Sequence, residues 1–205
     1  MDMHNLVDAE FIGTVYDDAD FSGAVWKASR FVGCQFRGAD LREIETDRCR
    51  FEDCDFTAVR GGASVHRGSA FTNCSFRMAQ LFGIRFEECK LTGTSFEQAG
   101  LTSLVVDGGD WSYVNLREQD LAGRNFTGLR LVNADLTGCD LRRVNLQGAD
   151  LTSATMNQVK LTGADLRNAN LDGIDLAGLD LHGVRIDLSQ AIAVAQAFGA
   201  IVDLS

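Results

Sequence analysis

Residues 161–186 read LTGADLRNANLDGIDLAGLDLHGVRI, in which a large apolar residue returns at every fifth position. The same spacing extends back to Leu6 without loss of phase, and 34 of its 37 positions are apolar or aromatic. A period of five matches neither an α-helix, which repeats every 3.6 residues, nor a strand, which alternates every two. The spacing therefore predicts a chain that turns a corner every five residues.

The other positions of the five-residue unit are specialised too, and we define them relative to the large apolar residue, the centre. The residue two before the centre, the inward position, is usually small, as in Ala134 and Ala164. The residue just before the centre is often Asp or Asn, and the residue two after it is Gly in 16 units. Gly and Asn tolerate the positive φ of tight turns. Four such sides make a square coil of twenty residues, and stacked coils pair as parallel strands about 4.8 Å apart.

Composition supports a solenoid independently. Average usage of about 5 % would give 205 residues roughly ten prolines, and this chain has none. In a solenoid nearly every backbone N–H donates to a neighbouring coil, so a proline would remove a rung. The right-handed preference of parallel crossovers favours a right-handed coil. We therefore expect an all-β, right-handed quadrilateral β-helix of about nine coils over residues 1–188.

The chain beyond Ile186 follows a different pattern, and we treat residues 189–205 as a separate tail. Asp187–Gln190 resembles the capped start of a helix, which we expect over residues 191–198 with Gly199 as its stop. This helix is apolar nearly all round. One face can cover the open edge of the last coil, and the other face needs a further partner. We expect a homodimer through this tail, and the alternative is a tail folded wholly onto its own coil.

Charge and cysteine positions limit the function. The formal net charge of −10 argues against nucleic acid or an anionic membrane as a direct partner and favours a basic partner surface. The first twenty residues have the pattern of neither a signal peptide nor a membrane span, so we expect a soluble, cytoplasmic protein. All six cysteines occupy inward positions, which predicts reduced thiols packed in the core rather than disulfides or a metal cluster.

The sequence contains no pattern typical of a catalytic site. Its three histidines are scattered, and no Ser or Cys has a base at matching register. The glycines recur singly every five residues instead of forming a phosphate loop. A convex surface around a solid core also predicts the absence of a pocket. We therefore expect a protein that is not an enzyme and that uses no cofactor, metal or small-molecule substrate.

The three exceptions to the apolar spacing are Thr46, Gly61 and His66. Gly61 leaves its centre without a side chain, and His66 follows Thr46 on the same face, one coil later. We expect a hydrogen bond between these two buried side chains. The alternative is a functional irregularity, such as a local bend, in residues 59–68.

Acidic residues are spread along the predicted rod. The face centred on Tyr16 and Phe36 is the most negative, and we name it the acidic face. Its acids are Asp17, Asp18, Asp55, Glu97, Glu118, Asp135 and Asp175. Acids just before the centres of other faces widen the negative zone, namely Asp110, Asp120, Asp140, Asp150, Asp165 and Asp180. The alternative for any single Asp is a solvated residue that suits the turn.

Units such as ADLTS at 149–153, ADLRN at 164–168 and ANLDG at 169–173 resemble the pentapeptide repeat family. The resemblance covers nearly the whole chain and implies the right-handed quadrilateral β-helix of that family. It leaves the function open, because one fold hosts many functions.

Three further features resemble the members of that family that confer fluoroquinolone resistance. They are HRGSAF at 66–71 with NCSF at 73–76, the uninterrupted frame, and RIDLSQAIAVAQAFG at 185–199. This resemblance implies a dimeric mimic of duplex DNA that binds DNA gyrase and protects it from quinolones. Its dimerising tail would correspond to Ile192, Val194, Ala195, Phe198, Ile201 and Val202. The alternative function is a structural scaffold or interaction module whose acidity only keeps it soluble.

Overall fold

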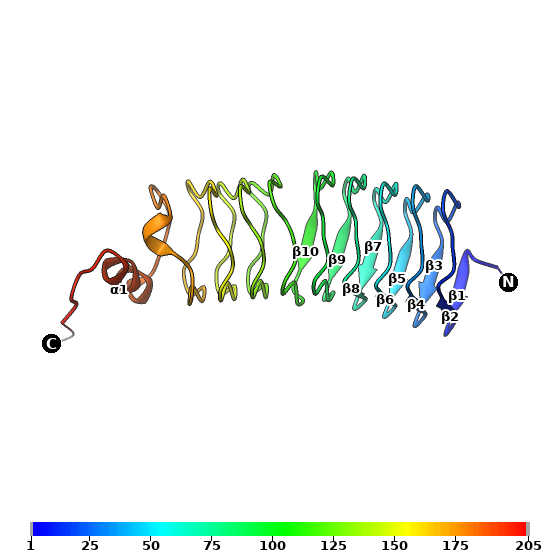
Figure 1. Ribbon diagram of the computed structural model, residues 1–205, viewed down its shortest axis with the longest axis horizontal. Helices are drawn as coiled ribbons and strands as arrows, with labels where there is room; N and C mark the ends of the chain where they lie inside the picture. Colours follow the sequence, from blue (N-terminus) through cyan, green and yellow to red (C-terminus); the bar gives the residue numbers. More distant parts are fainter. Residues whose placement is uncertain (1, 204–205) are drawn as a thin grey trace.

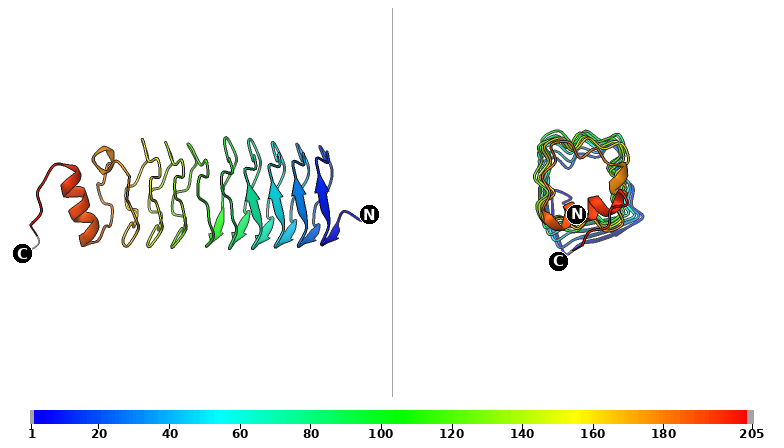
Figure 2. Two further views of the ribbon diagram at one scale, coloured as in Figure 1. Left: turned by 60° about the horizontal axis from the view of Figure 1, so that its bottom comes forward. Right: turned by 90° about the vertical axis from the view of Figure 1, so that its left-hand side faces the viewer.

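The computed structural model describes residues 2–203 and shows a four-sided solenoid closed by a C-terminal helix (Figure 1). Seen along the rod, the stacked coils trace a nearly square outline (Figure 2). The strands are β1 (Asn5–Val7), β2 (Glu10–Ile12), β3 (Val25–Lys27), β4 (Arg30–Val32), β5 (Glu45–Asp47), β6 (Arg50–Glu52), β7 (Val65–Arg67), β8 (Ala70–Thr72), β9 (Arg85–Glu87) and β10 (Val105–Asp107).

The coils stack in a constant register of twenty residues, which confirms the predicted four-sided coil. One parallel sheet has the order β1-β3-β5-β7-β9-β10 and the other the order β2-β4-β6-β8. Leu6 pairs with Trp26 at one end of the rod, and a bridge joins Asp165 to Arg185 near the other end. After β10 the coils are joined by isolated bridges rather than by three-residue strands.

The corners of the solenoid carry the positive φ angles that the repeat predicts, and many of them are not glycine. Gly33 has a φ of 60°, and Glu118 and Ala28 at equivalent positions have φ angles of 60° and 48°. The corner conformation is therefore imposed by the stacked coils, because residues with a Cβ adopt it as well. Gly178 departs from this pattern because it ends the 3-10 helix η1 (Leu176–Gly178).

The Asp and Asn residues just before the centres cap the turns. The Asp120 carboxylate accepts the backbone N–H of Ala122 at 3.1 Å, and the Asn145 side chain accepts that of Gln147 at 3.1 Å. Such short-range bonds stabilise a turn locally. Much of the repeated acidity is therefore a requirement of the fold.

The core is a column of stacked side chains. Phe31, Phe51 and Phe71 stack with centroid distances of 4.9 and 4.7 Å and interplanar angles of 9° and 10°. Towards the C-terminus the centres become leucine, and larger inward residues such as Leu129 and Val144 are buried beside them. This exchange of volume keeps the core close-packed, as interiors require.

All six cysteines are buried and unpaired, as predicted. Burial disfavours the thiolate, so the pKa of Cys89 and that of Cys139 are each raised to about 12. These thiols pack as small apolar groups.

The predicted hydrogen bond of His66 is present. His66 Nδ1 lies 2.8 Å from Thr46 Oγ1, and its Nε2 lies 3.2 Å from Ser64 Oγ. The ring also stacks on Phe86 with a centroid distance of 5.2 Å. The register is unbroken here, because Arg60 bridges to Gln80 within the irregular stretch.

The C-terminal helix α1 (Leu188–Ala197) begins three residues before the predicted start. Asp187 caps it, and the side chain of Gln190 accepts the Asp187 N–H at 3.0 Å in a capping box. The amide nitrogen of Gln190 also donates to Leu166 O at 2.5 Å and Ala169 O at 2.8 Å. The helix thus covers the last coil through a buried polar side chain. Within residues 2–203 no helix is long and apolar enough to cross a membrane.

A substitution at Gly109 would test how closely two consecutive coils approach each other. Its φ is +102°, and a Cβ there would lie 2.1 Å from the backbone oxygen of Cys89. Gly33 has a φ of +60° and open space around its Cβ position, so it is a matched control. We expect Gly109→Ala to lower the free energy of unfolding by roughly 2 kcal/mol more than Gly33→Ala does, measured by urea denaturation. Equal losses would contradict the close approach.

Because His66 is buried, we expect the free energy of unfolding to depend on pH. Burial lowers the pKa of the folded-state ring from the usual 6.5 to about 3, so in this interval the unfolded chain binds a proton that the folded chain does not. Stability is fully present above the unfolded pKa and falls as the pH decreases. When the pH is lowered from roughly 7.5 to 5, the free energy of unfolding of the wild type should fall by about 2 kcal/mol more than that of His66→Phe. An equal pH dependence of the free energy of unfolding in the wild type and in His66→Phe would contradict the buried, neutral ring.

Candidate functional site

The thirteen acids predicted to form the binding surface divide into two groups. Five of them are neutralised by arginine: Asp55 by Arg37 at 2.6 Å, Asp110 by Arg130 at 3.7 Å, Asp135 by Arg117 at 3.2 Å, Asp140 by Arg142 at 2.5 Å and Asp165 by Arg167 at 2.7 Å. The hydrogen bond from Arg142 lowers the pKa of Asp140, and the one from Arg167 lowers that of Asp165. These carboxylates stay ionised, but their charge is largely compensated within the protein.

The other eight acids have no ion pair among residues 2–203. They are Asp17, Asp18, Glu97, Glu118, Asp120, Asp150, Asp175 and Asp180. Some still serve the fold: Asp120, Asp150 and Asp180 cap turns, and Asp175 caps η1. Three acids of the acidic face, Asp18, Glu97 and Glu118, are exposed and accept no hydrogen bond from any described residue. These three carboxylates are the ones most available to a partner.

Among the described residues, backbone hydrogen bonds are missing on two sides between the coil that contains β10 and the next coil. β10 lies near the middle of the rod (Figure 1). One coil earlier the ladder is closed, because Leu81 N donates to Gly100 O at 3.0 Å and Gly83 N to Thr102 O at 2.9 Å. The equivalent N–H groups of Leu101 and Ser103 find no acceptor within the described chain. The bridges Ser95–Asn115 and Asp110–Arg130 close the ladder on either side of the opening.

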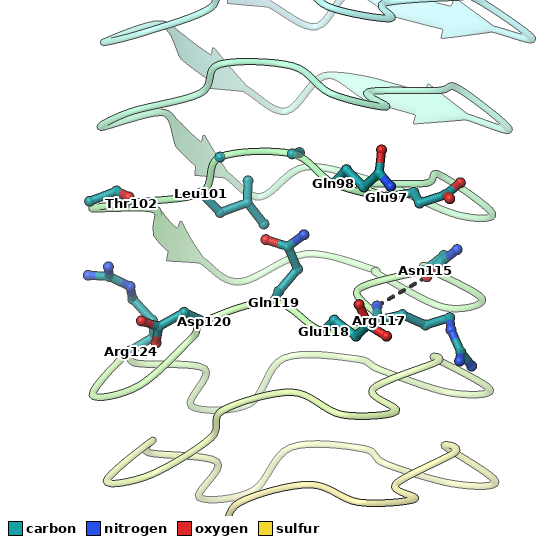
Figure 3. A pocket seen from close by; sticks show the side chains of 12 residues that line it. Glu97, Gln98, Leu101, Thr102, Asn115, Arg117, Glu118, Gln119, Asp120 and Arg124 are labelled. Carbon is teal, nitrogen blue, oxygen red and sulfur yellow. Dashed lines mark hydrogen bonds between the residues drawn. The ribbon is translucent and has the colours of Figure 1, made fainter.

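The opening forms a polar groove of about 480 Å³, which we name the mid-rod groove (Figure 3). Its lining residues are Glu97, Gln98, Ala99, Gly100, Leu101, Thr102, Asn115, Arg117, Glu118, Gln119, Asp120 and Arg124. The predicted absence of a pocket is therefore wrong. The groove also brings together three of the predicted acids, Glu97, Glu118 and Asp120, from two coils.

Two side chains explain why the coils part here. Gln119 and Arg124 occupy inward positions, where the other units place small or apolar residues. Gln119 is 7 % exposed and donates from Nε2 to Phe96 O at 3.0 Å, across the opening. Arg124 Nε is buried and has no partner among the described residues. Long polar side chains cannot pack in the apolar column without solvent or hydrogen bonds, so the ladder opens around them.

The mid-rod groove was missed at the sequence level, although a signal is present. Gln119 and Arg124 break the rule of small or apolar residues at the inward position in consecutive units, whereas residues 59–68 are unusual at their centres. A second, smaller groove of about 200 Å³ lies where η1 replaces a regular corner, beside Asp175. No group of three or more His, Cys, Asp or Glu side chains in residues 2–203 is arranged to hold a metal ion. The mid-rod groove presents carboxylates, side-chain amides and backbone N–H groups that have no acceptor among the described residues.

Comparison with protein families identifies the repeat. The profile described as pentapeptide repeats matches in 8 copies, over residues 5–43, 105–138, 120–158 and 156–192. These segments make up more than half of the chain. The protein therefore belongs to the pentapeptide repeat family.

The chain is also similar to individual members of this family and to solved structures. Over 103 residues, the chain is 40 % identical to the pentapeptide repeat protein MfpA of Mycobacterium tuberculosis. This alignment spans 50 % of the chain and 56 % of MfpA, little more than half of each. A trypsin-treated form of QnrB1, a plasmid-mediated fluoroquinolone resistance protein, is 25 % identical and superposes with a TM-score of 0.85 over 97 % of this chain and 100 % of its own. Full-length QnrB1 superposes with a TM-score of 0.82 at 24 % identity, over 94 % and 98 % of the two chains.

Proposed function

We propose that this member of the pentapeptide repeat family binds DNA gyrase as a mimic of duplex DNA and thereby protects the enzyme from fluoroquinolones. The observation that carries the proposal is the row of exposed, unpaired carboxylates at Asp18, Glu97 and Glu118 on one face of a straight rod. Proteins that bind DNA use basic surfaces that contact regularly spaced phosphates. A rigid rod with spaced carboxylates fits such a surface, and the similarity to MfpA and QnrB1 points to the same partner class.

The proposed mimicry depends on shape more than on charge density. Duplex DNA carries one charge per ~1.7 Å, whereas the whole chain has a formal net charge of −10. The arginine pairs of Asp55 and Asp135 reduce the field further. The partner would therefore recognise a few well-placed acids on a rod, acting in the cytoplasm where gyrase meets DNA.

A second copy of the chain is the proposed occupant of the C-terminal tail. Gln190 fixes one side of α1 to the last coil, and the apolar side chains of Leu188, Phe198 and Ile201 remain 78 %, 68 % and 92 % exposed. Ile192, Val194 and Ala195 on α1, and Val202 after it, are partly buried in the single chain. A two-fold dimer through this tail would cover the exposed groups and extend the rod end to end.

A structural scaffold is the second candidate, and one observation favours it. Asp120, Asp150 and Asp180 cap turns, so acidity at these positions follows from the fold alone. The unpaired acids at Glu97 and Glu118 have no such role in residues 2–203, and they distinguish the two functions.

Charge reversal at matched corners tests the gyrase proposal. Glu118 and Glu88 are both exposed glutamates at positive-φ corners, with φ angles of 60° and 50°, but they lie on diagonally opposite edges of the square coil. We expect Glu118→Lys to weaken gyrase binding at least about tenfold, because a like charge would face the basic surface, and to abolish protection in a supercoiling assay with ciprofloxacin. Glu88→Lys should change neither. Binding that is absent in the wild type, or equal losses in both variants, would refute mimicry by the acidic face.

The tail dimer predicts a change of mass in solution. Phe198→Asp places a charge in the proposed apolar interface and should convert a dimer into a monomer, measured by sedimentation equilibrium. Asp203→Ala, a change at an exposed acid of the same tail, is the control and should leave the mass unchanged. A wild-type protein that is already monomeric would overturn the proposal.

A further inference from the structure

We infer that the mid-rod groove accepts an extended, basic peptide segment of a partner protein, which adds a strand between the two parted coils. This inference deepens the proposed function and rests on it only for the identity of the partner. The occupant is argued from the backbone, from the charges around the groove and from the neighbouring surface.

The backbone groups at the groove favour an extended chain. Leu101 and Ser103 present unpaired N–H groups from one rim. On the other rim, the N–H groups of Asp120 and Asn125 have no acceptor among the described residues, although one coil later Asp140 N donates to Gln119 O at 3.0 Å and Asn145 N to Arg124 O at 2.9 Å. A strand laid parallel to the coils can pair with both rims at once, as in β-strand addition.

The charges favour basic side chains on that strand. Glu97, Glu118 and Asp120 line the groove and have no ion pair in residues 2–203. Of the two arginines that line it, Arg117 pairs with Asp135 at 3.2 Å. Side chains alternate along a strand, so every second residue of an inserted segment would face these carboxylates.

The buried polar atoms at the groove also favour a bound peptide backbone. Gln119 is 7 % exposed, and its amide lies between the coils, with only its Nε2 engaged by the protein (Figure 3). Arg124 Nε is buried without a partner. A carbonyl group of a bound backbone would accept a hydrogen bond from Arg124 Nε, which removes the cost of leaving that donor unpaired.

The chain's own tail is a poor occupant. Residues 187–205 contain no Lys or Arg and two Asp, so charge disfavours their insertion, whether from this chain or from a second copy. The surface next to the groove also suits a foreign protein. Met78 and Phe82, on the preceding coil, are 51 % and 64 % exposed and can pack against flanking residues of the partner.

The probe for the experiment is a capped seven-residue peptide of alternating Lys and Thr, added to the full-length protein and followed by amide hydrogen exchange. One control peptide is N-methylated at each Thr, which keeps the charge and removes backbone donors. A second control replaces each Lys by Glu. We expect the Lys peptide to slow exchange at Leu101, Ser103, Asp120 and Asn125 about tenfold, and both controls to slow it less than about twofold. Leu81 and Gly83, whose N–H groups are already bonded, should not change.

Two variants separate the groove from general attraction to the acidic face. Gln119→Ala with Arg124→Ala restores small inward residues, so the ladder should close, and the same amides should be protected without peptide. Glu97→Gln with Glu118→Gln keeps the shape and removes charge, so protection by the peptide should fall at least about fivefold. If the Gln119→Ala, Arg124→Ala variant does not fold, the Glu97→Gln, Glu118→Gln variant still tests the inference.

Equal protection by the N-methylated peptide, protection spread over the whole acidic face, or no protection would overturn the inference. Gyrase takes no part in this experiment. A negative result in the peptide experiment therefore does not contradict the proposed function. A negative result in the gyrase assay likewise does not contradict peptide binding in the mid-rod groove.

Discussion

The hydrogen bond from the backbone of one coil to the backbone of the next is the interaction on which the rest of this structure depends. It fixes the twenty-residue register from Leu6 to Arg185, excludes proline, and holds even alanine and glutamate at positive φ in the corners. The ladder also places equivalent side chains directly above one another. The stacked phenylalanines and the buried thiols both follow from that single constraint.

The ladder needs an interior that lets the coils approach, and the inward position controls this approach. At inward positions such as Cys34 and Ala39 the coils are joined by backbone hydrogen bonds, for example from Phe36 N to Asp55 O at 2.7 Å. Where Gln119 and Arg124 stand there, two sides of the coil part and a groove forms. A polar side chain in the core thus exposes backbone on the surface. The buried polar cluster around His66 has no such effect, because the ring bonds to Thr46 on the preceding coil and to Ser64, and Thr46 also bonds to Ser69.

The acids of this protein serve two different purposes, which depend on their position relative to the centre. Those just before a centre cap the turn, and several are also bound by arginine, as Asp140 and Asp165 are. Two acids after the centre on the acidic face, Glu97 and Glu118, have no ion pair within residues 2–203. A net charge alone therefore overstates the surface available to a partner, and recognition by this rod depends on a small number of side chains.

The sequence by itself determined the coil, its register, the buried reduced cysteines, the Thr46–His66 contact and the position of the capped helix. Each of these depends on residues near in sequence or separated by a constant twenty. The helix starts three residues before the predicted start, because Asp187 is the N-cap and the residue after an N-cap, here Leu188, is already helical. Only the tertiary structure decided which acids are paired, since an arginine 18 residues away, such as Arg117 for Asp135, reaches across coils by side-chain geometry. It also decided where the ladder opens, because that outcome depends on whether the groups buried between two coils can all be satisfied together.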